Sequence, residues 1–402
     1  MKKIVDKLFG HIYHPIVKYF RTRPELSAKL FKKCFSKTEH RKNRIYVDVT
    51  QVFVKDVGTG VQRVTNNIVK NIASISDEYD IEQVYLDNKQ GVFSCKTKSP
   101  VTFIKGDIFF ELDLNYILFT NYKHYFKRLR KHGVKISIFI HDLIPIRYPD
   151  FFDVGTYRVQ LRWMKVCLRF DQIIANSKST LDDVKAFIKE TSYVKRNRHI
   201  QLNYSLLGCD FSSMPKIADN STKNKKSSFL MVSTVDKRKN YKQALKAFTL
   251  LWEKGYDIEL NIVGRPGWCC EDTIEMIKNH PMLNKNLFWY SNGISDEELA
   301  KLYSEATAVI FASLAEGFGL AITEGAYFKK PLILRNLPVF KEIAGENAYY
   351  YDGLEPEDLS SAIENWLELY KKGTVPDSSK IQLRTWNECT REVYKYLTSA
   401  AK

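Results

Sequence analysis

Two glutamates flank a glycine-rich turn in SLAEGFGLAITEGA, residues 313–326. Glu316 lies in the turn, and Glu324 follows eight residues later, about two helical turns away if a helix begins between them. Free backbone N–H groups at a helix start bind anions. The donors here are the N–H groups of Phe318, Gly319 and Leu320. We expect them to hold a phosphate while both carboxylates accept hydrogen bonds from ligand hydroxyls. An ordinary solvated helix start is the alternative interpretation of this segment alone.

A basic cluster follows the strand-like run FLMVST, residues 229–234. Arg238 and Lys239 would lie at the carboxyl end of that strand, where cations can neutralise a diphosphate leaving group as its bond to carbon lengthens. Gly264 ends the next strand-like run in GRPG and would bring backbone close to a ligand. An exposed basic turn and a plain glycine turn are the simpler alternatives.

Two further candidates stand in the first half of the chain. Gly60 belongs to a GTG loop after the first predicted strand, where a close backbone approach to a phosphate requires the absence of Cβ. His141 ends the strand-like run VKISIFI and would face the edge of a cleft, with a structural histidine as the alternative. The sequence has no Ser-His-Asp order, zinc spacing, P-loop or Asp-x-Asp pair, so we expect no metal.

The elements that must position these residues alternate from Ile45 onward between short β-rich runs and amphipathic helical stretches. A chain of 402 residues suits two domains. The pattern predicts an α/β protein with two Rossmann-like, doubly wound domains facing across a cleft, the site of ligand binding in such folds. We expect a first strand over 45–54 and another over 204–208. The expected divisions are 1–44, a basic N-terminal segment; 45–208, the first domain; 209–228, a polar linker; 229–378, the second domain; and 379–402, a C-terminal helix that could cross back to the first domain.

The net charge of +16 is concentrated at the N-terminus, where residues 1–44 carry 13 Lys or Arg against 3 Asp or Glu. Apolar residues alternate with these cations, as in a helix lying on an anionic membrane surface, although a basic helix packed on its own domain fits equally. No nucleic-acid reader motif is present, and we expect no nucleic-acid partner. Seven scattered cysteines indicate a reducing compartment, and no apolar run or leader pattern predicts membrane insertion or secretion.

Taken in order, the motifs resemble glycosyltransferase family 4, the retaining transferases with two Rossmann-like domains. The resemblance covers most of residues 45–395 and is carried by nine segments: GTGVQRV (58–64), FIHDLIPIRYP (139–149), ANSKST (175–180), LLGCD (206–210), VSTVDKRKN (232–240), IVGRPGW (262–268), SDEELAKLYSEA (295–306), EGFGLAITEG (316–325) and LPVFKEIAGENAYYYD (337–352). Ala321 and Gly325 depart from the usual Pro and Ala of the family, and Thr234 stands where some members carry a phosphate-binding Arg.

The resemblance implies a role for each candidate. Glu316 would contact the hydroxyls of the donor sugar, and Glu324 would contact the ribose of the nucleotide. Arg238 and Lys239 match the diphosphate-binding pair. Gly60 would shape the donor and acceptor pockets, and His141 would lie near C6 of the transferred sugar. The sugar would be transferred with retention by front-face attack, and the leaving diphosphate would take the acceptor proton without a metal or other cofactor.

These roles predict a hexosyltransferase that moves a sugar from a nucleotide diphosphate sugar to a lipid-linked oligosaccharide in bacterial O-antigen, capsule or other surface polysaccharide synthesis. We expect it to be cytoplasmic and peripheral on the inner face of the cytoplasmic membrane. The first expectation for the donor is GDP-mannose, by analogy, while UDP-sugars and dTDP-rhamnose stay open. A sugar-nucleotide epimerase and a catalytically silent scaffold subunit of a polysaccharide assembly complex are the rival functions.

Overall fold

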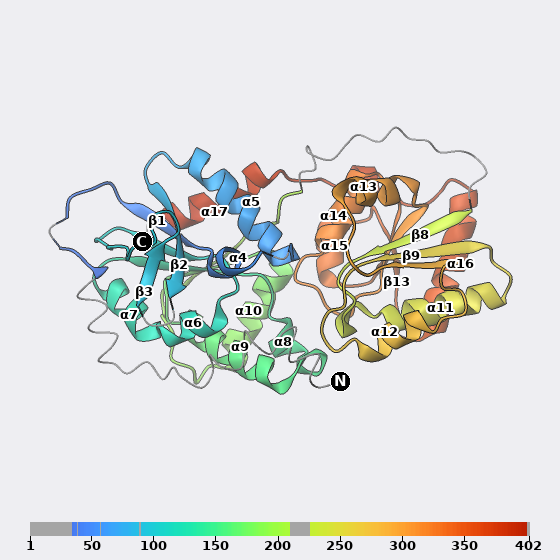
Figure 1. Ribbon diagram of the computed structural model, residues 1–402, viewed down its shortest axis with the longest axis horizontal. Coiled ribbons are helices and arrows are strands. Elements are labelled where there is room, and N and C mark those ends of the chain that lie inside the picture. Colours follow the sequence, from blue (N-terminus) through green and yellow to red (C-terminus); the bar gives the residue numbers. More distant parts are fainter. Residues whose placement is uncertain (1–33, 38, 57, 88–89, 210–225, 400–402) are drawn as a thin grey trace.

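The computed structural model describes residues 34–37, 39–56, 58–87, 90–209 and 226–399. Figure 1 shows two lobes side by side, each built around its own sheet. Each sheet is covered on both faces, because two separate clusters of buried side chains lie in each lobe. The predicted α/β architecture with two Rossmann-like domains is therefore confirmed.

The N-terminal lobe contains a seven-stranded sheet in the order β3-β2-β1-β4-β5-β6-β7, counted over the described residues. All neighbouring pairs are parallel except β2 with β3. Helices α6, α7 and α9 bury aromatic side chains against one face, and α5 and α17 cover the other. The elements are β1 (Arg44–Asp48), α4 (Thr50–Val54), α5 (Gly60–Ile75), β2 (Asp80–Asp87), β3 (Gly91–Ser94), β4 (Ile108–Glu111), α6 (Tyr116–Asn121), α7 (Lys123–Lys131), β5 (Lys135–Ile140), α8 (Ile144–Arg147), α9 (Val154–Cys167), β6 (Gln172–Ala175), α10 (Lys178–Glu190) and β7 (Gln201–Tyr204).

The C-terminal lobe contains an all-parallel sheet in the order β10-β9-β8-β11-β12-β13. Helices α11 and α16 pack on one face, while α13, α14 and α15 pack on the other. The elements are β8 (Ser227–Val232), a 3-10 turn (Lys237–Lys239), α11 (Tyr241–Glu253), β9 (Ile258–Val263), α12 (Glu271–Lys278), β10 (Leu287–Tyr290), α13 (Asp296–Glu305), β11 (Ala308–Phe311), α14 (Leu320–Tyr327), β12 (Leu332–Arg335), α15 (Pro338–Ala344), β13 (Tyr349–Tyr351) and α16 (Pro356–Lys371).

The strand order of the C-terminal sheet reverses direction between β8 and β11. In open parallel sheets, ligands bind outside the carboxyl ends of the strands at such a reversal, because the two connections leave on opposite faces and open a crevice. The connection after β8 contains Arg238 and Lys239, and the connection after β11 contains Glu316. The N-terminal sheet has the same reversal between β1 and β4.

The expected strand over 45–54 is wrong in its second half. β1 ends at Asp48, and Thr50–Val54 form the short helix α4. Buried carboxylates cause the change: Asp48 accepts a hydrogen bond from the Thr50 N–H at 3.0 Å, and Asp113 accepts the N–H groups of Gln51 and Val52 at 2.6 and 2.9 Å. A run of valines and phenylalanine has strand propensity, but this local bond to Asp48 and the long-range bonds to Asp113 override it.

The expected strand over 204–208 is also displaced, since β7 ends at Tyr204. The chain leaves the sheet there to pack against α17 (Trp386–Thr398), which follows the second lobe in sequence. A Cβ on Gly208 would lie 2.5 Å from the Trp386 backbone, so only glycine permits this approach. Figure 1 shows α17 back in the N-terminal lobe beside α5, with which it shares a buried cluster.

The predicted basic segment 1–44 and linker 209–228 fall largely outside the described residues, which exclude 1–33 and 210–225. Where it is described, the first segment packs on the N-terminal lobe. Cys34 is buried, Phe35 forms a bridge with Phe103, and Arg41 pairs with Asp107 at 2.7 Å. In the described part of the chain, no helix is both long and apolar enough to cross a membrane.

Candidate active site

The two connections at the reversal of the C-terminal sheet are tied together by their backbones. The Leu314 N–H donates to the Arg238 carbonyl at 2.7 Å. Asn240 ends the basic turn in the left-handed region, at φ 53°, and the chain enters α11 directly afterwards. This sharp exit directs the side chains of Arg238 and Lys239 toward the connection after β11, as their ion pairs show.

Glu316 lies at the centre of this basic cluster. Its Oε2 accepts a hydrogen bond from Arg238 Nη1 at 2.8 Å, and its Oε1 accepts bonds from Lys239 and from the Ser313 hydroxyl, the latter at 2.9 Å. Asp236 Oδ1 adds a second carboxylate 3.5 Å from Arg238 Nε. The side chains of Glu316 and Lys239 are only 6% and 12% exposed, so water screens these charges weakly.

The cluster changes the acidity of its members. Burial acts to raise the pKa of Glu316, but the charges of Lys239 and Arg238 outweigh it and hold that pKa at about 2. Burial and the neighbouring Arg238 lower the pKa of Lys239 against the attraction of Glu316. Burial also raises the pKa of Asp142, which lies just after β5 in the other lobe and is close enough to Arg238 for their charges to interact. Three carboxylates, Glu316, Asp236 and Asp142, thus interact with two largely buried cations.

The start of α14 has the predicted geometry. Gly319 is the N-cap residue and has a φ of 97°, which favours glycine. Within the described residues, no acceptor is paired with the backbone N–H of Phe318, Gly319 or Leu320. The side chain of Phe318 has a role that was not predicted, because it is buried in the apolar cluster of the N-terminal lobe beside Val64. It anchors this helix start to the other lobe.

Glu324 is held by residues of both lobes. Its Oε1 accepts a hydrogen bond from Arg63 Nη1 at 2.7 Å, and its Oε2 accepts the Tyr303 hydroxyl at 2.8 Å. Arg63 comes from α5 of the N-terminal lobe, and Tyr303 comes from α13. Neither partner was predicted. The only sequence signal was the position of Arg63 inside the GTGVQRV motif, one helical turn after Gly60.

His141 is buried at the end of β5, on the side of the lobe boundary. Its Nε2 lies 2.9 Å from the Leu112 carbonyl oxygen, which can only accept, so Nε2 carries the hydrogen and donates. Burial lowers the pKa of the imidazole. His141 is therefore a neutral side chain whose Nδ1 keeps its lone pair.

The two lobes meet around Gly317. Its carbonyl oxygen accepts hydrogen bonds from the Ser177 hydroxyl at 2.8 Å and from the Thr180 hydroxyl at 3.1 Å. On α15, Glu342 accepts the backbone N–H groups of Lys178 and Ser179 at 2.6 and 2.9 Å, at the start of α10. Carboxylates at helix N-termini are favourable, so this contact adds to the attachment of the lobes.

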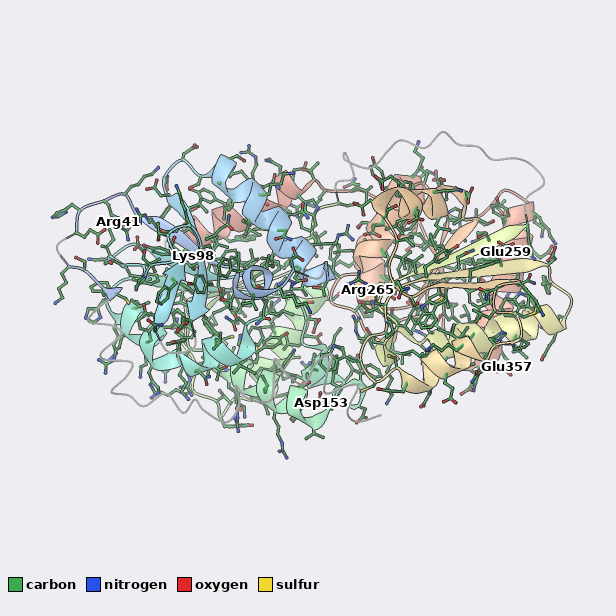
Figure 2. The ribbon with its side chains drawn as sticks, in the orientation of Figure 1. Arg41, Lys98, Asp153, Glu259, Arg265 and Glu357 are labelled. Carbon is green, nitrogen blue, oxygen red and sulfur yellow. The ribbon has the colours of Figure 1, made fainter. Side chains whose placement is uncertain are left out.

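The remaining predicted glycines differ in their surroundings. A Cβ on Gly264 would lie 1.7 Å from the Ser233 carbonyl oxygen, so close packing of two connections already requires glycine there. A Cβ on Gly60 would meet Leu320 Cδ1 at an ordinary 3.9 Å. Figure 2 places Arg265, the residue after Gly264, at the edge of the C-terminal lobe that faces the N-terminal lobe. The described residues contain no group of three or more His, Cys, Asp or Glu side chains that could hold a metal ion.

Replacing Gly317 by alanine should weaken the attachment of the lobes. The new Cβ would lie 2.2 Å from the His141 carbonyl oxygen of the other lobe, closer than real Cβ contacts. Overpacking of this kind costs about 1–3 kcal/mol. We expect a melting temperature lower by roughly 5 °C and a larger radius of gyration in small-angle scattering. Gly60→Ala, which has space for its Cβ, should leave both values unchanged; a Gly317→Ala protein that matches it would contradict this account of the contact.

Comparison with known proteins supplies two family matches. Residues 213–377 match the model described as Glycosyl transferases group 1, and residues 115–186 match the model described as Glucosyltransferase 3-like, N-terminal domain. The serotype-specific mannosyltransferase WbdA of Escherichia coli is 36% identical over 380 residues, which are 88% of this chain and 46% of that protein. The O-antigen chain mannosyltransferase RfbU of Salmonella typhimurium is 28% identical over 57% of this chain and 60% of its own length. The chain thus spans about half the length of the WbdA relatives.

Solved structures share the fold. HepE from Anabaena, in complex with UDP and glucose, superposes with a TM-score of 0.65 and 15% identity over 90% of this chain and 100% of that one. The sucrose-phosphate synthase of Thermosynechococcus elongatus gives a TM-score of 0.60 and 17% identity over 88% and 94% of the two chains. At this level of identity the likeness supports the two-lobed architecture.

Proposed function

We propose that the chain, whose residues 213–377 match the Glycosyl transferases group 1 family model, transfers a hexose from a nucleotide diphosphate sugar to a glycan acceptor. The observation that carries the proposal is the pair of largely buried cations, Arg238 and Lys239, at the reversal of the C-terminal sheet. Free N–H groups at the start of α14 lie in the connection that carries Glu316. These groups suit the binding of a diphosphate at the place where such folds bind nucleotides.

The charges of the cluster favour this chemistry. Glu316 and Asp236 together balance the charges of Arg238 and Lys239 in the absence of a ligand, so the cations stay ordered without a net surplus of buried positive charge. A diphosphate would take over part of that role, and Glu316 would then be available to accept hydrogen bonds from sugar hydroxyls. As the bond between sugar and phosphate lengthens, negative charge grows on the diphosphate, where preorganised cations stabilise it. Glu324 would take the ribose hydroxyls.

GDP-mannose is the proposed donor, and mannose is the sugar transferred. The support is that several relatives are named as mannosyltransferases, among them WbdA, RfbU and the O-antigen chain mannosyltransferase B of Escherichia coli. A ligand that binds only the folded protein stabilises it, by about 2.7 kcal/mol at a ligand concentration of a hundred times its Kd. Its melting temperature rises as a result. Melting the protein with GDP, UDP and dTDP in turn should give the largest increase with GDP. A larger increase with UDP or dTDP would reassign the donor, and no increase with any of them would contradict the proposal.

A lipid-linked oligosaccharide at the inner face of the cytoplasmic membrane is the proposed acceptor. The two supports are the names of the O-antigen relatives and the surplus of about ten positive charges over residues 1–44. Basic segments with interleaved apolar residues bind anionic membrane surfaces, and the attraction weakens with salt. The enzyme would then meet its acceptor at the membrane.

Removing residues 1–33 should abolish binding to vesicles that contain anionic phospholipid. The cut must stop there, because Cys34 is buried in the core of the N-terminal lobe and Phe35 pairs with Phe103. We expect the full chain to cosediment with these vesicles at low salt and to be released at high salt, whereas the shortened chain stays in solution at both. Neutral vesicles are the control. Equal binding of both chains to the anionic vesicles would contradict the assignment of this segment.

A further inference from the structure

The contact between Arg63 and Glu324 joins the two lobes beside the proposed nucleotide site. Arg63 extends from α5 of the N-terminal lobe, and its Nη1 lies 2.7 Å from Glu324 Oε1 on α14. The Arg63 side chain is 42% exposed, whereas the Glu324 side chain is 3% exposed. A partly exposed cation of one lobe therefore reaches a carboxylate buried in the other.

A buried carboxylate needs both charge compensation and hydrogen bonds. Tyr303 supplies a hydrogen bond, because its hydroxyl donates to Glu324 Oε2 at 2.8 Å. The Tyr303 ring is held in place by stacking on Phe328, with the two ring centroids 5.0 Å apart. Arg63 supplies the positive charge. Burial would lower the pKa of Arg63, but the attraction of Glu324 outweighs it and raises that pKa. Each oxygen of Glu324 keeps a second lone pair for another donor, such as a hydroxyl.

The backbone around Arg63 is also held in place. Thr59 caps α5, because its hydroxyl oxygen accepts a hydrogen bond from the Gln62 backbone N–H. In return, the side-chain oxygen of Gln62 accepts a hydrogen bond from the Thr59 backbone N–H. The Arg63 N–H donates to the Thr59 carbonyl at 2.9 Å. One turn earlier, Gly60 packs toward Leu320 at the start of α14. The first turns of α5 and α14 therefore lie against each other, and the ion pair forms one turn further along.

We propose that Arg63 is a positioning residue for the donor, contributed by the opposite lobe, which pairs with Glu324 and holds its carboxylate oriented toward the ribose hydroxyls. The inference rests on the proposed function. Because the guanidinium and the carboxylate belong to different lobes, the ribose subsite reaches its full affinity when the lobes are in contact. Arg63 thereby couples recognition of the nucleotide to the approach of the lobe that would carry the acceptor.

The test compares nucleotides with and without ribose hydroxyls. Calorimetry with GDP, UDP and their 2′,3′-dideoxy analogues gives a hydroxyl preference for each protein, the ratio of the two dissociation constants. We expect the natural protein to prefer the hydroxylated nucleotide about tenfold or more, since bonds to a charged group are worth that much. Arg63→Gln and Glu324→Gln should each bring the ratio close to one, and the double variant should add nothing. Arg63→Lys should restore part of it.

Arg130→Gln is the matched control. Arg130 pairs with Asp171 at 2.6 Å inside the N-terminal lobe, with a side-chain exposure of 36% close to that of Arg63. It should keep the natural hydroxyl preference. An Arg63→Gln protein with the natural preference would overturn the inference and leave the proposed function standing. A natural protein that binds neither nucleotide would overturn both.

Discussion

Replacing Lys239 by alanine is expected to lower kcat for sugar transfer by about 10²- to 10³-fold, the usual effect of removing one group that stabilises transition-state charge. The physical reason is burial: Lys239 is 12% exposed and lies against Glu316, so water compensates poorly for the loss of its charge beside the developing diphosphate. Affinity for the nucleoside diphosphate should fall as well. Initial rates with a labelled sugar nucleotide, together with calorimetry, measure both effects.

Lys242→Ala provides the control for this variant. Lys242 lies three residues later on α11 and pairs with Asp272 at 2.8 Å, with both side chains well exposed. Exposed pairs contribute little to stability, so this protein should retain natural rates. If Lys239→Ala retains kcat within threefold of the natural value, the assignment of the diphosphate site is wrong.

Replacing Glu316 by glutamine should separate binding from turnover. Glu316 pairs with both cations, so its removal leaves Arg238 and Lys239 without their main partner. A nucleoside diphosphate can then neutralise them, and we expect GDP to bind at least as tightly as it does to the natural protein and to raise the melting temperature further. Turnover should fall by about 10²-fold, because the bonds of the carboxylate to the sugar hydroxyls are lost.

The pH dependence of folding gives a second measure of the same variant. In the folded protein the pKa of Glu316 is about 2, below its ordinary 4.5. A lowered carboxyl pKa contributes stability that is complete above the ordinary pKa and is lost as the pH falls toward the folded value. The stability difference between the natural protein and Glu316→Gln should therefore be constant above about pH 5 and shrink between pH 4.5 and 2. A difference that does not change over this range would contradict the ion pairs.

Glu364→Gln is the control for Glu316. Glu364 pairs with Lys254 at 2.9 Å on the outer helices of the same lobe, and its side chain is 25% exposed. Natural turnover is expected from this variant. Weaker GDP binding by Glu316→Gln than by the natural protein would show that Glu316 does not compete with the diphosphate for Arg238 and Lys239.

Sequence patterns predicted the parts of the site that follow from local structure. Glycines, a helix start and the ends of parallel strands placed Glu316 and the Arg238–Lys239 pair at one edge of one sheet, and the structure brings them into contact. They did not reveal that Glu316 pairs with both cations, because 77 or 78 residues separate the partners and only the strand order of the sheet brings them together.

Long-range contacts account for what was missed. Arg63 and Glu324 are 261 residues apart, and their contact depends on how the lobes meet, which no local pattern specifies. The propensity of the run 50–54 predicts a strand, whereas Asp113, more than 60 residues away, binds the N–H groups of Gln51 and Val52 and, together with Asp48, turns the run into α4. The sequence predicts that Gly264 lets the backbone approach a ligand. In the structure, the Ser233 carbonyl oxygen by itself leaves no room for a side chain there.

Sugar transfer itself most directly tests whether the protein is a glycosyltransferase. The full chain would be incubated with labelled GDP-mannose, UDP-sugars and dTDP-rhamnose, each with membranes that contain lipid-linked oligosaccharide acceptors and each without them. We expect label in the lipid fraction with one donor, GDP-mannose, only when acceptor is present, and loss of that signal in Lys239→Ala. Turnover of a sugar nucleotide without any acceptor would indicate an epimerase. Folded protein that transfers no sugar from any donor would contradict the central claim.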